Sequence, residues 1–407
     1  MTCSAYEVAL CVLHTLEKAG YPAYLVGGCV RDRLLQKEPV DYDITTRAHP
    51  EKVMELFTHT IPTGLAHGTV TVLMDGHAIE VTTFRTEEGY SDHRRPDRVT
   101  FVTDLTADLA RRDFTINAIA EDCRGERFDP FEGQADLASR VIRTVGEASA
   151  RFQEDALRMV RAIRFATQLD FVIETKTRSA IAHNGSLLHT VAVERVTREL
   201  EKMWGSAQPA HGLKAITELG LWNHLPPMNS WEGKGKDLPV WMVSVNSITS
   251  PYQWWALLLS LLQVPVEHAD KRMRQLRVNH KVVQEVALRY QLAYSFPAAI
   301  TERRGKKLLL THGVSAVLEG CELAIVLRQL PSSLYPSFQR WKDELVVTHL
   351  SQLEINGGCL RSIIPRPPGP WLGNTLDELL LRVACAEIPN EREYLLKEGI
   401  RLAKTYS

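Results

Sequence analysis

Short apolar runs alternate with polar positions over the first 150 residues of the chain. Four runs, at 23–26, 42–45, 69–74 and 78–84, are rich in β-branched and aromatic residues and are predicted to be strands. Residues 50–57 and 105–120 have the spacing of apolar positions that is typical of helices. The pattern therefore predicts a head that mixes strands with helices.

The pattern changes after about residue 137, where long helical periodicities replace the strand-like runs. All eight tryptophans lie at or beyond Trp204. Stretches rich in Gly and Pro, at 226–239 and 364–373, indicate further divisions. We expect an α+β protein in four parts: a head at 1–137, a helical neck at 138–205, a helical body at 206–320 and a helical tail at 321–407.

The charge is almost balanced, with 48 Lys and Arg against 49 Asp and Glu. A nucleic-acid partner must therefore be held by local basic patches. Two basic runs are candidates: residues 271–281, which begin with Lys271 and Arg272, and residues 303–307. Each run fits contact with phosphates and a solvated helix face equally well.

The cysteines and the apolar segments predict a cytoplasmic protein that does not bind membranes. None of the seven cysteines forms a C-x-x-C pair, which favours reduced thiols over a zinc site or a disulfide framework. Residues 5–20 lack the continuous apolar stretch of a signal peptide. Residues 254–262 are densely apolar but too few to span a bilayer, and we expect them to form a buried helix.

The first candidate for chemistry is the segment from Gly27 to Asp43. A strand that ends in Gly27-Gly28 and continues into a helix allows a phosphate to approach the backbone, and Arg31 adds a positive charge. The spacing matches neither G-x-G-x-x-G nor a P-loop. Asp41 and Asp43 are two residues apart in a predicted strand, so their carboxylates share a face and could bind Mg²⁺. Taken alone, the glycine pair also fits an ordinary turn, and the two aspartates also fit a solvated surface pair, because both are common in proteins.

Three further elements follow along the chain. Glu80 lies in a predicted strand and is either a third carboxylate directed at the metal or an exposed glutamate. Arg111, Arg112 and Asp113 are expected to open a helix that becomes apolar. Arg158, Arg161 and Arg164 recur every three residues along a helix, one turn after Glu154 and Asp155. Each element alone also fits surface charges or a simple salt bridge within a helix.

Together, in this order, the elements resemble the class II tRNA nucleotidyltransferases, the family of CCA-adding enzymes and bacterial poly(A) polymerases within the polymerase-β-like superfamily. The motifs that carry the resemblance are these: Gly-Gly-x-Val-Arg-Asp with Asp-x-Asp, Arg-Arg-Asp-x-Thr-x-Asn-Ala, Asp129-Pro130-Phe131-x-Gly133, Glu-Asp-x-x-Arg, and Val193-Glu194-Arg195 with Glu199-Leu200. Gly369-Pro370-Trp371-x-Gly373 is similar to a late element of Bacillus-type members.

The resemblance implies a polymerase-β-like nucleotidyltransferase head that adds C, C and A to the 3′ end of tRNA from CTP and ATP. It implies that Asp41 and Asp43 hold the catalytic Mg²⁺ ions, and that Gly28, Arg31 and Arg112 contact the nucleotide. The helical body and tail are expected to bind the tRNA. The oligomeric state stays open, and a homodimer is one alternative.

The resemblance also implies that the protein itself selects the base. Asp155 would accept a hydrogen bond from the exocyclic amine of cytosine or adenine, and Arg158 would donate to the adjoining ring nitrogen. Guanine and uracil carry a carbonyl oxygen in place of that amine. Burying this oxygen against the carboxylate, with no hydrogen between them, would cost about 1–3 kcal/mol of binding free energy. Arg161 and Arg164 would extend the basic face beneath the nucleotide.

Residues 87–98 match the family's loop that is associated with the switch to A addition, which argues against addition of C alone. Three alternatives remain: an enzyme that adds only A beside a CC-adding partner, a poly(A) polymerase, and a non-catalytic RNA-binding protein derived from the fold. Intact Asp41 and Asp43 argue against the last of these.

Overall fold

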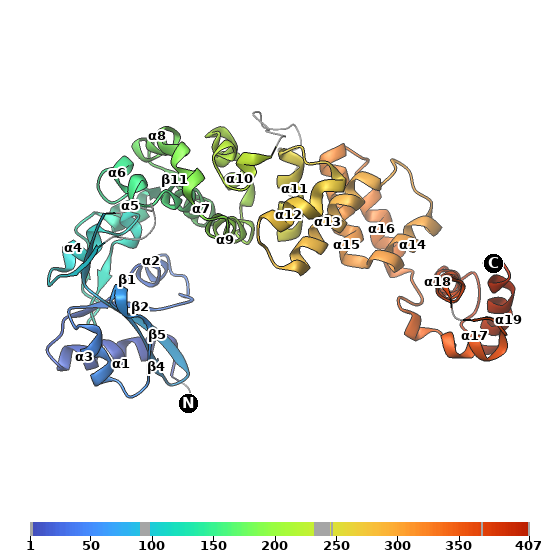
Figure 1. Ribbon diagram of the computed structural model, residues 1–407, viewed down its shortest axis with the longest axis horizontal. Helices are drawn as coiled ribbons and strands as arrows, with labels where there is room; N and C mark the ends of the chain where they lie inside the picture. The colour runs from blue at the N-terminus through green and yellow to red at the C-terminus, as the bar shows by residue number, and fades with distance from the viewer. Residues whose placement is uncertain (1–2, 90–97, 232–244, 246, 368, 406–407) are drawn as a thin grey trace. The chain divides into compact units, whose positions relative to one another are not determined.

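The computed structural model describes residues 3–89, 98–231, 245, 247–367 and 369–405. The chain divides into two compact units, Met1–Leu238 and Pro239–Ser407 (Figure 1). The boundary lies at the end of the stretch rich in Gly and Pro at 226–239. The finer division into four parts stays a prediction.

The first unit is built on a seven-stranded mixed sheet of order β3-β4-β5-β2-β1-β8-β9. Strands β2 and β5 are parallel, and the other neighbours are antiparallel. Alternating apolar residues of β4 and β5, such as Val70, Val72 and Val81, are buried, as their period of two requires. The strands are β1 Ala23–Val26, β2 Asp43–Thr46, β3 Thr60–Gly64, β4 Thr69–Met74, β5 His77–Thr83, β8 Ala120–Glu121 and β9 Arg127–Phe128.

Helices α1 (Ala5–Lys18) and α3 (Pro50–Leu56) pack against this sheet (Figure 1). A capping box formed by Ser4 and Glu7 starts α1. Helix α2 (Gly28–Leu34) follows β1 after a single residue. The hairpin of β6 (Arg85–Glu88) and β7 (Arg98–Phe101) leads into α4 (Leu105–Ala110).

The rest of the first unit is mostly helical. Helix α7 packs against α9 and α10 through buried residues that include Met159, Val160 and Ile163. Strands β10 (Val141–Ile142) and β11 (Val172–Ile173) form a short parallel pair. The helices are α5 Gly133–Ser139, α6 Ala148–Glu154, α7 Leu157–Leu169, α8 Thr175–Asn184, α9 Val193–Trp204 and α10 Pro209–Glu218, and the 3₁₀ turns are η1 Leu65–His67, η2 Thr115–Asn117, η3 Gly185–Thr190, η4 Leu221–Asn223 and η5 Met228–Ser230.

The described part of the second unit consists of helices. Helix α13 packs against α11, α12 and α15, and the predicted buried helix at 254–262 is confirmed, because α11 buries Trp254, Trp255 and Leu258. A separate apolar cluster around Leu360, Leu379 and Leu395 joins α17, α18 and α19. The elements are α11 Pro251–Leu261, η7 Val266–His268, α12 Ala269–Gln275, α13 His280–Ser295, α14 Glu302–His312, α15 Val314–Arg328, α16 Leu334–Asp343, η8 Leu350–Gln352, α17 Gly357–Ile363, α18 Pro370–Ala384 and α19 Arg392–Ala403.

The mixed sheet and the helical remainder confirm the predicted α+β class. The predicted helix at 105–120 is wrong beyond Ala110, where α4 ends. The side chain of Asp113 accepts hydrogen bonds from the Phe114 amide at 2.8 Å and from Asn117 Nδ2 at 3.0 Å, and such local bonds compete with a helix. Phe114 is extended and pairs with Thr144, so Arg111–Asp113 do not open a helix.

Candidate active site

The site begins where β1 ends at the glycine pair. Gly27 has a φ of +77°, which favours glycine, and a Cβ there would lie only 3.1 Å from Nη1 of Arg112. Gly27 therefore lets the backbone turn into α2 while Arg112 passes close beside it. The predicted order of strand, glycine pair and helix is confirmed here.

Carboxylates gather at the neighbouring strand ends. Strand β2 starts at Asp43, so Asp41 lies just before the strand instead of within it, and both side chains are exposed beside buried Tyr42 and Ile44. In the parallel pair of β2 and β5, Asp43 lies opposite Glu80. Asp43 reaches solvent, although protein atoms surround much of it. Its partial burial, together with the charges of Glu80 and Asp41, raises the pKa of Asp43 to about 6.

A cavity of about 500 Å³ opens beside Asp43. Six basic and three acidic residues line it, an excess of three formal positive charges. Such a cavity favours an anion of several negative charges. The lining residues are Gly27, Gly28, Arg31, Asp43, Arg112, Asp113, Asn117, Asp155, Arg158, Arg161, Arg164, Phe165 and Lys202.

Most of the predicted site residues are thus brought together in one place. Gly28, Arg31, Asp43, Arg112, Asp155, Arg158, Arg161 and Arg164 all line the cavity, and Asp41 and Glu80 do not. Within the described ranges, no group of three or more His, Cys, Asp and Glu side chains is placed to hold a metal ion. A metal site at Asp41 and Asp43 would therefore take its remaining ligands from water or from a substrate.

Asp155 and Arg158 lie at the start of α7, where the Arg158 backbone N–H donates to the Asp155 carbonyl at 3.0 Å, but their side chains have other partners. Arg195 of α9 donates two hydrogen bonds to the Asp155 carboxylate, at 3.1 and 2.7 Å. Arg158 donates to Glu154 Oε2 at 2.6 Å, which is the i,i+4 salt bridge that the sequence allowed. The two side chains are held by different partners.

Backbone carbonyls hold Arg158 as well. Its Nη1 donates to the carbonyl of Arg151 at 3.3 Å, and its Nη2 donates to the carbonyl of Arg111 at 3.1 Å. These bonds and the Glu154 pair use three of the five guanidinium hydrogens. Among the described residues, Nε and one hydrogen of Nη2 have no hydrogen-bond partner, so Arg158 can still donate to a ligand in the cavity.

A chain of hydrogen bonds joins α2 to α7 across the cavity. Arg31 Nη1 donates to Asn117 Oδ1 at 2.7 Å, and Asn117 Nδ2 donates to Asp113 Oδ1 at 3.0 Å. Arg161 donates to Asp113 Oδ2 at 2.9 and 2.6 Å. Burial would raise the pKa of Asp113, but the charge of Arg161 and the bonds from Asn117 and Arg161 outweigh it and lower that pKa to about 2.

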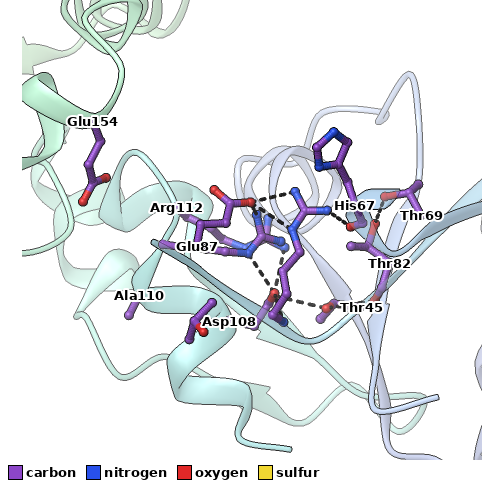
Figure 2. Close-up of polar contacts among 12 residues, drawn as sticks. Thr45, His67, Thr69, Thr82, Glu87, Asp108, Ala110, Arg112 and Glu154 are labelled. Carbon is purple, nitrogen blue, oxygen red and sulfur yellow. Dashed lines mark hydrogen bonds and ion pairs between the residues drawn. The ribbon is translucent and has the colours of Figure 1, made fainter. Parts of the chain in front are cut away.

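A second polar cluster lies around Asp108 of α4 (Figure 2). Asp108 is fully buried, accepts from Thr45 Oγ1 at 3.1 Å and from Arg111 Nε at 3.0 Å, and lies 3.5 Å from Nη2 of Arg112. Burial raises the pKa of Asp108, but Arg111 and Arg112 outweigh it, so the pKa lies below its usual range. Asp108 thus fixes the side chain of Arg112 at the edge of the cavity.

The same cluster holds the base of the predicted loop at 87–98. Glu87 of β6 pairs with Arg85 at 2.8 Å and with Arg111 at 3.1 Å. The loop prediction itself falls largely on residues 90–97, which lie outside the described residues. Arg111 therefore contacts Glu87 through its side chain and Arg158 through its carbonyl.

Comparisons with known proteins agree with these features. The chain matches the families described as "Poly A polymerase head domain" over residues 23–143, "Probable RNA and SrmB- binding site of polymerase A" over 170–231 and "tRNA nucleotidyltransferase domain 2 putative" over 246–398. It is 40% identical to a CCA-adding enzyme of Geobacillus thermodenitrificans over 396 residues, which cover 95% of each chain. It is 39% identical to a CCA-adding enzyme of Lactiplantibacillus plantarum over 399 residues, which cover 96% of this chain and 95% of the relative.

The chain belongs to the CCA-adding enzyme family. The crystal structure of the Bacillus stearothermophilus CCA-adding enzyme in complex with CTP covers 99% of both chains with a TM-score of 0.81 and 34% sequence identity. The predicted family is confirmed. No helix in the described part of the chain is long and apolar enough to cross a membrane. The cytoplasmic location stays a prediction.

One motif on which the predicted resemblance rests is structural in this chain. Asp129 accepts hydrogen bonds from the backbone N–H groups of Gly133 and Gln134, at 2.7 and 2.9 Å, and so caps the start of α5. A Cβ at Gly133 would lie 2.2 Å from the carbonyl oxygen of Thr115. The Asp-Pro-Phe-x-Gly motif therefore packs α5 tightly against the turn η2, which ends at Asn117.

Sequence reasoning missed several residues that line or support the cavity. Phe165 and Lys202 belong to none of the predicted motifs, and Asp113 and Asn117 are predicted only as members of the Arg-Arg-Asp-x-Thr-x-Asn-Ala motif. Arg195 and Glu199 belong to the predicted structural motif, and they hold Asp155 and Arg164. The sequence signal for Asp113, Asn117, Arg195 and Glu199 is that each belongs to a motif, and Phe165 and Lys202 have no such signal.

The basic runs of the second unit are partly engaged in ion pairs. Lys306 is 4% exposed and contacts Glu302 at 2.6 Å and Glu344 at 3.0 Å, so it is neither a solvated residue nor available to phosphate. Arg303 pairs with Glu378 and Glu387, which ties α14 to α18 and to the segment after it. Lys271, Lys281, Arg304 and Lys307 are exposed and remain candidates for contact with phosphate.

Proposed function

We propose that this chain adds C, C and A to the 3′ end of tRNA, using CTP and ATP and releasing pyrophosphate. The observation that carries the proposal is one cavity that contains both the carboxylate edge at Asp43 and the helix start with Asp155 and Arg158. A nucleotide bound there would present its phosphates and its base to different side chains. The likeness to CCA-adding enzymes over almost the whole chain supports the same activity.

Nucleotidyltransferases use divalent metal ions, and we propose Mg²⁺, held by Asp41 and Asp43 with Glu80 nearby. Carboxylate oxygens are the ligands that Mg²⁺ prefers. The raised pKa of Asp43 supports the fit, because burial first and then the charges of Glu80 and Asp41 disfavour its charged form, and a bound cation would stabilise that form. Bound there, Mg²⁺ would lower the pKa of the tRNA 3′-hydroxyl and neutralise charge on the departing pyrophosphate.

Arg31, Arg112 and the backbone at Gly28 are proposed to bind the triphosphate and ribose. Both arginines are oriented before a nucleotide arrives, Arg31 by Asn117 and Arg112 by Asp108. Cationic donors that are already placed need not reorganise when phosphate charge shifts during transfer. These residues would hold the α-phosphate in line with the attacking hydroxyl.

Asp155 and Arg158 are proposed to select the base. Arg195 and the backbone N–H of Leu157 take three of the four acceptor positions of the Asp155 carboxylate, which leaves one for the amine of cytosine or adenine. Arg158 retains two donor hydrogens, as described above. Guanine and uracil would place a carbonyl oxygen against the Asp155 carboxylate, with no hydrogen between them. Arg161 and Arg164 would contribute positive charge beneath the nucleotide.

Incubation with tRNA that lacks its last three nucleotides tests the proposal. With CTP alone the product should gain two residues, and with CTP and ATP together it should gain three and then stop. An enzyme that adds only A would extend tRNA ending in CC but not the shorter tRNA. A poly(A) polymerase would add many A residues with ATP alone, and the variant Asp43→Ala serves as the inactive control.

A further inference from the structure

The guanidinium groups of three arginines lie around the aromatic ring of Phe165. The Cζ atoms of Arg164, Arg31 and Arg161 lie 3.7, 5.1 and 5.4 Å from the ring centroid. Arg161 and Arg164 belong to α7, as does Phe165, whereas Arg31 comes from α2. The ring is therefore the place where cations from two separate elements meet at the wall of the cavity.

Each of these cations also has a polar partner away from the ring. Arg31 donates to Asn117, Arg161 donates to Asp113, and Arg164 donates to Glu199. Three like charges at such spacing repel one another, and an aromatic face attracts a cation whereas an aliphatic side chain does not. The partners and the ring together fix where each guanidinium lies.

The ring itself is held in place by the core. Phe165 is 6% exposed and makes an edge-on contact with Phe114, with 5.7 Å between ring centroids and 78° between ring planes. Phe114 is fully buried. Because Arg164 lies at 3.7 Å and the ring is almost buried, little ring surface is left for a nucleobase to stack on.

We propose that Phe165 is a positioning residue that gathers Arg31, Arg161 and Arg164 into one anion-binding cluster for the nucleoside triphosphate. The inference rests on the proposed function, since it takes the cavity as the nucleotide site. Phe165 acts through the three arginines and touches no reacting atom. The charge of the phosphates, and not the identity of the base, is what this cluster recognises.

The test compares ligand affinity without tRNA. CTP, ATP and inorganic triphosphate are titrated, each with Mg²⁺, into the wild type, Phe165→Leu, Phe165→Met and Phe165→Tyr. Phe165→Leu and Phe165→Met should weaken all three ligands by a similar factor of about ten, because the cation–ring attraction is lost. Phe165→Tyr keeps the ring and should stay within about twofold of the wild type. Both aliphatic variants are measured, so that the proposal is still tested by one of them if the other folds poorly.

Phe57→Leu is the matched control, because Phe57 is also 6% exposed but lies at the end of α3 and does not line the cavity. It should lower the melting temperature and leave the three affinities unchanged. Wild-type affinities in both aliphatic variants would overturn the proposal, as would a loss confined to ATP and CTP, which would indicate base stacking.

Arg31→Ala separates this inference from the function on which it rests. If Arg31→Ala weakens CTP binding and the aliphatic variants at 165 do not, only the positioning role of Phe165 is wrong. If Arg31→Ala binds CTP and inorganic triphosphate as tightly as the wild type, the assignment of the cavity as the nucleotide site is wrong as well.

Discussion

Arg195 of α9 holds both carboxylate oxygens of Asp155 at the start of α7, with hydrogen bonds of 3.1 and 2.7 Å. The side chains are mostly buried, 20% and 15% exposed. A bidentate pair of this kind fixes the plane of the carboxylate as well as its position. The residue proposed to select the base is therefore oriented by a helix that follows it by about forty residues.

Arg195→Lys should reduce base selection. A lysine offers a single point charge and cannot hold both oxygens, so the Asp155 carboxylate would rotate. We expect discrimination of CTP over UTP to fall about tenfold, which corresponds to about 1.4 kcal/mol. Arg178→Lys is the control, because its pair with Glu218 is exposed at the surface. Unchanged discrimination in Arg195→Lys would show that this pair only stabilises the fold.

Asp41→Ala and Asp43→Ala should each abolish nucleotide addition while tRNA binding stays within about twofold of the wild type. Each substitution removes a proposed ligand of Mg²⁺ from the head and leaves the helices of the second unit unchanged. Primer extension measures the first effect, and filter binding of labelled tRNA measures the second. Near-normal turnover in either variant would contradict the metal assignment.

The acid stability of the fold should depend on Asp113. Its pKa is lowered to about 2 in the folded protein, so its ion pair stabilises the fold above about pH 4 and loses this effect as the pH falls toward 2. Asp113→Asn should lower the free energy of unfolding by about 2 kcal/mol near neutral pH, and this difference from the wild type should shrink below pH 4. Urea unfolding at several pH values measures it. Asp170→Asn is the control, because Asp170 is exposed, and its effect on the free energy of unfolding should not depend on pH. A loss of stability in Asp113→Asn that stays the same at every pH would contradict the account.

Replacement of residues 89–97 tests the role predicted for the loop at 87–98. Residues 88 and 98 lie opposite each other in the backbone register of the β6–β7 hairpin. An Asn-Gly turn can therefore join these strands directly and keep the Glu87–Arg111 ion pair. The variant should still incorporate C and fail to add the final A. Product lengths measured with CTP alone and with CTP and ATP together show whether A addition is lost. Normal A addition would make the segment an ordinary surface connection.

Local patterns in the sequence predicted four of the seven strands of the sheet, and the motifs that carry the resemblance predicted most of the cavity lining. The strand at 69–74 was predicted with its observed bounds, because it begins with four β-branched residues in which apolar Val alternates with polar Thr. The helix at 105–120 was predicted too long, because apolar spacing does not reveal that Asp113 bonds to its own backbone neighbours. The roles of Phe165 and Asn117 escaped prediction for another reason. Their roles depend on contacts with residues far away in the chain, such as Arg31.

The central claim is that side chains of this protein, and not a nucleic-acid template, select the base, and Asp155→Ala tests it most directly. Single-nucleotide incorporation into tRNA is measured with CTP, ATP, UTP and GTP for the wild type, Asp155→Ala and Arg158→Ala, together with their melting temperatures. Asp155→Ala should weaken the use of CTP and ATP and narrow their advantage over UTP and GTP by about tenfold or more, because the carboxylate also disfavours a carbonyl-bearing base. Arg158→Ala should weaken both correct substrates. A lower melting temperature with an unchanged ratio of correct to incorrect incorporation in Asp155→Ala would contradict the account.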